Sequence, residues 1–213
     1  MTEKKSDTAV KRRGRPRDYD RQAALQRATE TFWKTGYAGT SLDSLSAATG
    51  MNPPSLYAAF GNKHALYIEA LSYYWQASLA ATREALAGDR PLAEALMLAY
   101  DAALSFYFSN KGQRRGCFVI GTAVTESFED PEIRKSVATG VRLIDADFEA
   151  RFRLAVEKGE LKDDADPAAL AILASATMQT IAIRARAGTS RDELREIARK
   201  AVGVICGYPV EAK

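Results

Sequence analysis

The stretch from Thr40 to Lys63, TSLDSLSAATGMNPPSLYAAFGNK, contains the start and stop signals of two short helices in close succession. Thr40, followed three positions later by Asp43, forms a capping box, which predicts a helix that begins near Ser41. Gly50 is expected to end that helix, because the residue just past a helix end often adopts a positive φ angle. These signals predict a helix, a glycine turn and a second helix.

The second of these helices presents one large side chain to solvent. Asn52 can cap it, and Pro53 suits its first position, where no amide hydrogen bond is lost. Leu56 and Phe60, four residues apart, point to the core, which leaves Tyr57 as the largest group on the solvent side. Its hydroxyl is well placed for a phosphate or a base edge, so the pair is interpreted as a helix-turn-helix that reads DNA. An ordinary helical hairpin in an all-helical protein is the alternative.

A basic residue follows this pair of helices. Lys63 is expected in the first turn of a third helix, where an ammonium group and backbone N–H groups can both meet a DNA phosphate. His64 is the only histidine of the chain, and it suits a helix cap or a phosphate contact better than a metal site, which would need further ligands. The sequence therefore predicts no metal and no cofactor.

Residues 1–17 concentrate positive charge in an otherwise nearly neutral chain. They hold seven Lys and Arg residues against two acidic ones, +7 − 2 = +5, whereas the whole chain has a net charge of +3, so the remaining residues sum to −2. Arg15 and Arg17, separated by a proline, can extend along a minor groove, where arginine is favoured. The alternative is a solvated leader that touches nothing.

From Asp20 to Leu71 the sequence resembles the DNA-binding domain of the TetR family of bacterial transcriptional repressors. The shared pattern is FWKTGY, then GTSLDSLSAATGM, then PSLYAAFGNKHALY, in that order. The resemblance implies DNA contacts at Ser41, Pro54, Ser55, Tyr57 and Lys63. With the residues above, the expected DNA-binding set is Arg15, Arg17, Thr40, Ser41, Pro54, Ser55, Tyr57, Lys63 and His64.

The sequence departs from the family pattern on the recognition helix. Ala58 and Ala59 stand where many members have larger polar or aromatic residues. Base discrimination at these positions is therefore expected to be weak or to rest on apolar contacts to thymine methyl groups.

The rest of the chain is punctuated as helices, with no convincing strand alternation. The expected fold class is all-α, with an N-terminal helix-turn-helix domain of three helices followed by a larger helical domain for ligand binding and dimerisation. The expected divisions are 1–17 for a disordered basic arm, 18–65 for the DNA-binding domain and 66–213 for the ligand-binding and dimerisation domain. Helices beyond the reading pair are expected at about 20–35, 63–87, from 91, 130–159, 166–188 and 190–207.

The last two predicted helices favour a homodimer. The final helix has apolar residues at helical spacing on one face, and the helix before it, 168–183, is apolar nearly all round, so it must be covered on more than one side. Burial within a monomer would also satisfy this pattern. The resemblance implies instead a four-helix bundle with a second copy, which would set two reading helices ~34–36 Å apart on one face of DNA.

The middle of the chain carries many aromatic residues, most of which are expected in the core. Small ligands bind in apolar cavities with few polar groups, often between helices. A cavity for an unknown small-molecule effector is therefore predicted here. Its expected lining residues are Trp75, Tyr100, Leu104, Cys117, Val124 and Met178.

Cys117 lies in the segment GQRRGCFVIGTAVTE, directly after Gly116 and beside Arg114 and Arg115. A helix N-terminus and arginine charge both favour the thiolate, which is the reactive form. A thiol switch that responds to oxidants or electrophiles, as in some TetR-like proteins, is one hypothesis. A small buried residue that packs at a helix start is the other, and Cys206 is interpreted as packing.

Several classes of protein are disfavoured. No run approaches ~18 apolar residues and the N-terminus is charged, so no membrane span and no secretory signal are expected. With two cysteines and no disulfide framework, the cytoplasm is the default location. The phosphate-loop, nucleophile-elbow and zinc-helix motifs are missing from the sequence, which argues against an enzyme.

The leading hypothesis is a ligand-responsive transcriptional repressor. A dimer would bind a pseudo-palindromic DNA operator, and a small-molecule inducer would release it. An architectural DNA-binding protein without an effector is the alternative, and the sequence leaves open whether the bound protein represses or activates.

Overall fold

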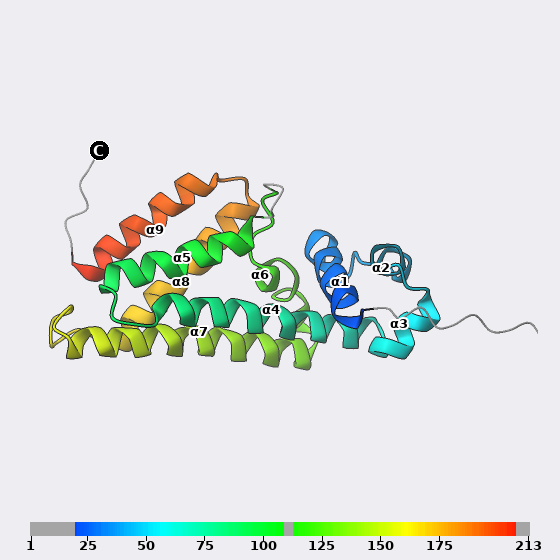
Figure 1. Ribbon diagram of the computed structural model, residues 1–213, viewed down its shortest axis with the longest axis horizontal. Coiled ribbons are helices and arrows are strands. Elements are labelled where there is room, and N and C mark those ends of the chain that lie inside the picture. The colour runs from blue at the N-terminus through cyan, green and yellow to red at the C-terminus, as the bar shows by residue number, and fades with distance from the viewer. Residues whose placement is uncertain (1–19, 109–112, 208–213) are drawn as a thin grey trace, which may run out of the picture.

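A computed structural model describes residues 20–108 and 113–207 (Figure 1). Within these residues the chain forms α-helices and one 3-10 turn, with no strand, which confirms the all-α prediction. The predicted basic arm 1–17, with Arg15 and Arg17, lies outside the described residues. In chain order the elements are α1 (Arg21–Thr35), α2 (Leu42–Thr49), α3 (Pro53–Phe60), α4 (Lys63–Leu86), α5 (Leu92–Tyr107), α6 (Phe118–Thr122), η1 (Glu126–Phe128), α7 (Pro131–Glu157), α8 (Pro167–Arg186) and α9 (Arg191–Cys206).

Most of the predicted helix starts are confirmed, because the capping residues are in place. Asp20, Asp130 and Asp166 each accept backbone N–H hydrogen bonds at the starts of α1, α7 and α8. Proline follows the cap in both α7 and α8. Ser190 and Glu193 form the predicted capping box of α9. These boundaries follow from local chemistry alone.

The predicted capping box of Thr40 and Asp43 is wrong. Ser41 caps α2 instead, and its hydroxyl accepts a hydrogen bond from the backbone N–H of Ser44 at 3.1 Å. Thr40 is only 2% exposed, and its hydroxyl donates to the carbonyl of Gly36 at 2.6 Å. The turn after α1 folds Thr40 back onto the end of that helix, so the cap is one residue later than expected.

The molecule is elongated, with α1, α2 and α3 gathered at one end (Figure 1). α4 begins at that end and runs beside α7 through the larger part of the molecule, while α5, α8 and α9 pack together above them in this view. His64 Nε2 lies 2.7 Å from Asp130 Oδ2, and this contact joins the start of α4 to the start of α7. α4 is therefore the continuous physical link between the two parts.

The hydrophobic core has two clusters, and α6 belongs to the one at the helix-turn-helix end. Phe118, at the start of α6, packs among Trp33, Tyr67 and Tyr74 with ring centroids 5.4–6.0 Å apart. The second cluster fills the space between α5, α7, α8 and α9. The first cluster thus extends beyond α4 into α6 and Ile133 of α7. The end of the molecule formed by α1, α2, α3 and the first part of α4, called the reading end below, is therefore packed directly onto the larger part.

Candidate DNA-reading surface and effector cavity

The recognition helix α3 is built from local signals and two apolar anchors. Asn52 Oδ1 accepts a hydrogen bond from Ser55 N at 2.9 Å, as the sequence predicted for this cap. Leu56 and Phe60 are 3% and 4% exposed, and they hold the helix against its neighbours. Tyr57 is 47% exposed, so its phenol is available on the outer face. α3 is thus anchored from one side and open on the other.

The other residues predicted to contact DNA differ in how far they are exposed to solvent. Ser41 and Pro54 are exposed at the first turns of α2 and α3, so they remain available. Thr40 is buried and bonded to the end of α1, so it is withdrawn as a contact residue. Lys63 is half-buried, with its ammonium nitrogen 4.5 Å from the centre of the Tyr37 ring. It lies at the first turn of α4, as expected.

His64 is committed to a protein carboxylate. Its Nε2 atom lies 2.7 Å from Asp130 Oδ2, and its Nδ1 atom lies 4.0 Å from Glu132. The backbone N–H of Ile133 and the contact with His64 both lower the pKa of Asp130, so this partner stays ionised. Two carboxylates beside the imidazole disfavour a phosphate at the same place, so His64 is left out of the contacts proposed below, and its place in the DNA-binding set stays a prediction.

A cavity of about 300 Å³ lies in the larger part of the molecule, between α4, α6, α7 and α8. Of the residues predicted to bind the ligand, Trp75, Cys117, Val124 and Met178 line this cavity, and their contact with a ligand stays a prediction. The full lining set is Tyr74, Trp75, Ser78, Tyr107, Cys117, Val119, Ile120, Val124, Val137, Val141, Ile144, Ser175, Met178 and Gln179. The side chains are mostly apolar and none carries a full charge, which suits a small-molecule site.

Two of the predicted lining residues face elsewhere. Tyr100 and Leu104 are fully buried in the cluster between α5, α8 and α9, and neither lines the cavity. The Tyr100 hydroxyl donates to the carbonyl of Ala174 on α8 at 3.1 Å, so this aromatic ring is part of the core. Helix α5 turns these residues away from the cavity, and only Tyr107 at its end reaches the wall.

The α7 wall of the cavity was missed in the sequence. Val137, Val141 and Ile144 are spaced four and three residues apart, which places them on one face of α7. That stripe was a usable signal. The sequence does not predict which helices this apolar face of α7 packs against, because residue spacing on one helix does not show which other helix it faces.

A glycine on α7 makes room for the largest side chain of the wall. A Cβ atom at Gly140 would lie 2.2 Å from Cε2 of Trp75, so only glycine lets the indole pack against α7. The Trp75 Nε1 atom is buried and has no hydrogen-bond partner. Trp75 is therefore held by α7 while its one polar group is left unsatisfied.

Cys117 is at the N-terminus of α6, as predicted, but its surroundings disfavour the thiolate. Burial raises the pKa of the thiol, although the Tyr74 hydroxyl donates to Sγ at 3.3 Å. The neighbouring arginines do not face the sulfur: Arg114 donates to the carbonyl of Gly188, and Arg115 pairs with Glu30. Backbone N–H groups of Ile120 and Val119 at the start of α6 lower the pKa of this thiol, as expected for a helix end, but burial is the larger effect and raises it overall. The expected help from the arginines is wrong, and the thiol switch stays a hypothesis.

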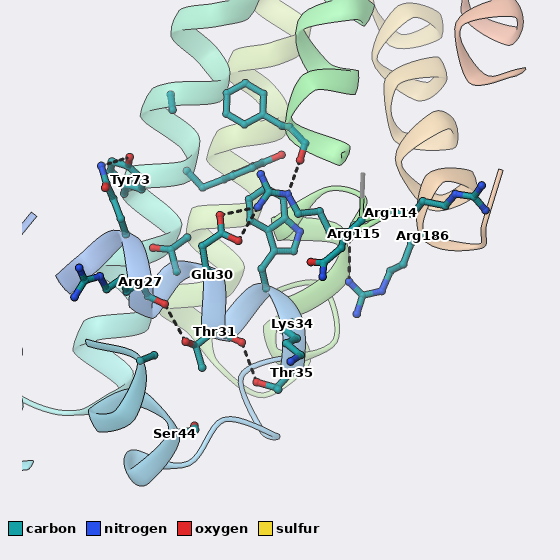
Figure 2. A pocket seen from close by; sticks show the side chains of 18 residues that line it. Arg27, Glu30, Thr31, Lys34, Thr35, Ser44, Tyr73, Arg114, Arg115 and Arg186 are labelled. Atoms are coloured by element: carbon teal, nitrogen blue, oxygen red, sulfur yellow. Dashed lines mark hydrogen bonds and ion pairs between the residues drawn. The ribbon is translucent and has the colours of Figure 1, made fainter. Parts of the chain in front are cut away.

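The loop before α6 connects the reading end to the cavity wall. Arg115 pairs with both carboxylate oxygens of Glu30 on α1, at 2.6 and 2.7 Å, and its guanidinium lies 3.8 Å from the Trp33 ring centre (Figure 2). Trp33 Nε1 donates to the carbonyl of Gly116 at 3.2 Å. The next residue is Cys117, so one short segment contacts α1 and the cavity.

An open cleft of about 1200 Å³ runs beside this junction, lined by side chains of α1, α4, α8 and the loop (Figure 2). Gly116, next to the lining residue Arg115, has φ +66°, and a Cβ atom there would lie 2.7 Å from the carbonyl oxygen of Ala182 on α8. The loop is therefore in close contact with α1 on one side and α8 on the other. Among residues 20–108 and 113–207, no group of three or more His, Cys, Asp or Glu side chains is arranged to hold a metal.

Two family comparisons cover both parts of the chain. The family model for bacterial regulatory proteins of the tetR family matches residues 24–70. The family model for the tetracyclin repressor-like C-terminal domain matches residues 93–201. The chain belongs to the TetR family. The resemblance found in the sequence is thereby confirmed, and the protein is a DNA-binding transcriptional regulator of this family rather than an enzyme.

Individual relatives agree with this assignment. The HTH-type transcriptional repressor ComR of Escherichia coli (strain K12) is 32% identical over 188 residues, which are 88% of this chain and 90% of ComR. The TetR family regulator CifR has been solved as a cysteine mutant with 26-base-pair double-strand operator DNA. That structure is 32% identical in sequence and has a TM-score of 0.80. The match covers 89% of this chain and 98% of the CifR chain. A TetR family regulator from Cytophaga hutchinsonii, 22% identical with a TM-score of 0.76 and covering 90% of this chain and 96% of its own, shares the fold alone.

Proposed function

We propose that this TetR family protein is a transcriptional repressor that binds a pseudo-palindromic operator as a homodimer and is released by a small-molecule inducer. Its place of action is the cytoplasm, where bacterial DNA lies. The observation that carries the proposal is a short segment before α6 that contacts both α1 and the cavity: Trp33 donates a hydrogen bond to Gly116, and Cys117 lines the cavity. A change in the wall therefore has a direct route to the reading end.

Exposed apolar side chains on the last two helices support dimerisation through them. Ile172, Leu173 and Ile183 on α8 are 61%, 54% and 56% exposed, and Val204 on α9 is 71% exposed. By length and composition α8 is apolar enough to cross a membrane, yet it packs against α5, α7 and α9 along its length. Its remaining apolar face fits a second copy, because contiguous exposed apolar residues mark interaction sites.

The DNA contacts proposed for the dimer are those at the first turns of α2, α3 and α4. Ser41, Pro54, Ser55 and Tyr57 supply neutral contacts, and Lys63 supplies charge. Arg15 and Arg17 of the arm are proposed to follow the minor groove. Phosphate contacts would position the protein, and Tyr57 and its neighbours would face the base edges. The operator complex of CifR, a 32% identical protein with the same fold, supports operator binding in general, whereas these individual contacts follow from the sequence pattern.

The inducer acts through its different affinity for two states of the protein. An occupied cavity would favour a position of α6 and the preceding loop in which Gly116 and Arg115 hold α1 differently. The two reading helices would then no longer match successive grooves. A coupling of ~1–3 kcal/mol would change operator affinity roughly 5–150-fold.

The two alternative functions have less support. An architectural DNA-binding protein needs no cavity, whereas this chain has one of about 300 Å³ at a helix junction. A thiol switch at Cys117 needs an available thiolate, whereas burial raises the pKa of this thiol.

Selection of bound sequences from random DNA tests the proposal. We expect one palindromic motif with half-site centres about one helical turn apart, because a two-fold dimer places its reading helices ~34–36 Å apart. Light scattering on the same preparation should give twice the chain mass. A monomer in solution, or a pool without a preferred motif, would contradict the repressor and favour the architectural alternative.

A further inference from the structure

Positive charge is concentrated in the open cleft of about 1200 Å³ between the reading end and α8 (Figure 2). The charged side chains of its lining are five cations and one carboxylate, a net charge of +4: Arg27, Glu30, Lys34, Arg114, Arg115 and Arg186. Residues 18–213 together sum to −2, so outside the cleft they sum to −2 − 4 = −6. The cleft is a positive hollow on an otherwise acidic body, and such a surface attracts anions.

Most of this charge has no carboxylate in contact with it. Arg115 pairs with Glu30, the one acidic residue of the lining. Arg114 helps to lower the pKa of Glu193, although the hydrogen bonds from Ser190 are the larger cause. Within residues 20–108 and 113–207, four of the five cations form no ion pair: Arg27, Lys34, Arg114 and Arg186. An anion that enters the cleft therefore meets charge that the protein leaves uncompensated.

The guanidinium of Arg186 is held at the cleft by neutral groups. Its Nη1 atom donates to the carbonyl oxygen of Arg115 at 3.3 Å, which uses one of the five N–H donors of the group. Gly121 of α6 makes room for it, because a Cβ atom there would lie 3.2 Å from Cζ of Arg186 and closer still to Nη1. The guanidinium is thus positioned without losing its charge to a carboxylate.

The unpaired cations come from both sides of the cleft. Lys34 lies in the last turn of α1, in the reading end, whereas Arg186 lies in the last turn of α8, in the larger part. Both side chains are exposed, and both line the same cleft. A compound with two or more anionic groups can contact both of them at once, and it would then connect the reading end to α8.

The cleft differs in polarity from the cavity of about 300 Å³. No Asp, Glu, Lys, Arg or His lines that cavity, and Tyr74 is the one described residue that lines both spaces. A charged compound in the cavity would lose its hydration without meeting a counter-charge, which is strongly unfavourable. The two spaces therefore select different classes of compound.

We propose that the cleft is a second ligand site, for a small compound with two or more phosphate or carboxylate groups, and that Lys34 and Arg186 bind those groups. Arginine suits this role because its planar N–H groups match both kinds of anion. The proposal goes beyond the proposed function, since it needs neither the operator nor the inducer of the cavity. The bound compound would hold α1 against α8.

Calorimetry on the full chain without DNA, at one fixed ionic strength, tests the proposal with three probes. Inorganic tripolyphosphate and citrate should bind, and the tighter of the two shows whether phosphate or carboxylate is preferred. Acetate, which carries a single charge, should bind at least about tenfold more weakly than either. Because a ligand of the folded chain stabilises it, the bound probe should also raise the melting temperature.

Two double variants assign the binding to the cleft. Lys34→Gln with Arg186→Gln should lower the affinity for the preferred probe at least about tenfold, because hydrogen bonds between charged groups are the strong ones. Arg184→Gln with Lys200→Gln removes the same charge from exposed residues of α8 and α9 outside the cleft, and it should change the affinity by less than about twofold. All four positions are exposed, so both variants are expected to fold, which thermal melting checks.

Four results would each overturn the proposal. They are no binding of tripolyphosphate or citrate, binding of acetate as tight as theirs, an unchanged affinity in the cleft variant, and equal losses in the two double variants. An unchanged affinity would place the anion elsewhere, for example on the basic residues 1–17. Operator selection is a separate measurement, so its failure contradicts the repressor and not the anion site.

Discussion

The reading end and the cavity are built in opposite ways. On α3, the cap Asn52, the anchors Leu56 and Phe60 and the outward Tyr57 all come from one stretch of nine residues, numbers 52–60. The cavity wall is assembled from five helices and the residues that flank α6, with residues as far apart in sequence as 74 and 179. A substitution at the reading end should therefore change one property, and a substitution where the two regions meet should change both.

Phe118 should give the largest effect, because it belongs to the core of the reading end and begins the helix that borders the cavity. It is fully buried among aromatic rings. Phe118→Ala is expected to lower the free energy of unfolding by about 3–5 kcal/mol, measured by urea denaturation. Phe128→Ala, at a residue that is 83% exposed, should change it by less than about 0.5 kcal/mol. Two separate transitions in Phe118→Ala, with only one shifted, would show that the regions are independent.

Substitution of Tyr57 should lower the operator affinity without changing the free energy of unfolding. The residue is 47% exposed, so Tyr57→Phe is expected to remove only a contact to phosphate or base, and hydrogen bonds to charged groups contribute ~1.5–3 kcal/mol. Operator affinity is expected to fall roughly tenfold to hundredfold in a fluorescence anisotropy titration. Tyr73→Phe serves as the control. It removes a hydroxyl on α4 that accepts a hydrogen bond from Gln26 on α1, and it should leave the operator affinity unchanged. Equal losses in both variants would remove α3 from the proposed interface.

The ion pair between the regions should affect operator geometry more than stability. Glu30 pairs with Arg115 across the junction, and Glu69 pairs with Arg21 within the reading end, at similar distances of 2.6 and 2.7 Å. The substituted carboxylates are solvent-exposed, Glu30 to 61% and Glu69 to 36%, so Glu30→Gln and Glu69→Gln should each cost less than about 1 kcal/mol of stability.

Only Glu30→Gln should alter the response to operator spacing. When one base pair is added between the half-sites, the loss of affinity should be smaller by up to about fivefold, because the reading end is less firmly oriented. Binding to both operators is compared for the two variants and the wild-type chain. The same spacing penalty in all three would show that the pair does not orient the reading end.

Substitution of Asp130 should have the smallest effect. This effect is on the free energy of unfolding, and it depends on pH. Hydrogen bonding at the α7 cap and the contact with His64 lower its pKa in the folded chain below the unfolded value of ~3.9. Its contribution to stability is therefore present above the unfolded pKa and is lost as pH falls through the folded pKa. Between pH 6 and pH 3 the wild-type chain should lose more stability than Asp130→Asn, in denaturation curves at each pH. Parallel losses would contradict this role of the carboxylate.

The places where sequence analysis failed are the places where distant segments meet. Thr40 has the spacing of a cap, yet the turn after α1 buries it. His64 follows a lysine at a helix start, as a phosphate contact would, yet α7 brings Asp130 within hydrogen-bond distance of it. Tyr100 and Trp75 are both aromatic residues on predicted helices, and only the packing of α7 and α8 decides that one is core and the other lines the cavity.

The amino-acid order alone determined the helices, most of their caps, the helix-turn-helix and the family, because these depend on signals within a few residues of one another. Only the tertiary structure decided which side chains enclose the cavity, that burial raises the pKa of the Cys117 thiol, and that Arg115 pairs with α1 rather than with the sulfur. Burial and charge pairing are set by neighbours in space, and those neighbours lie tens of residues away along the chain.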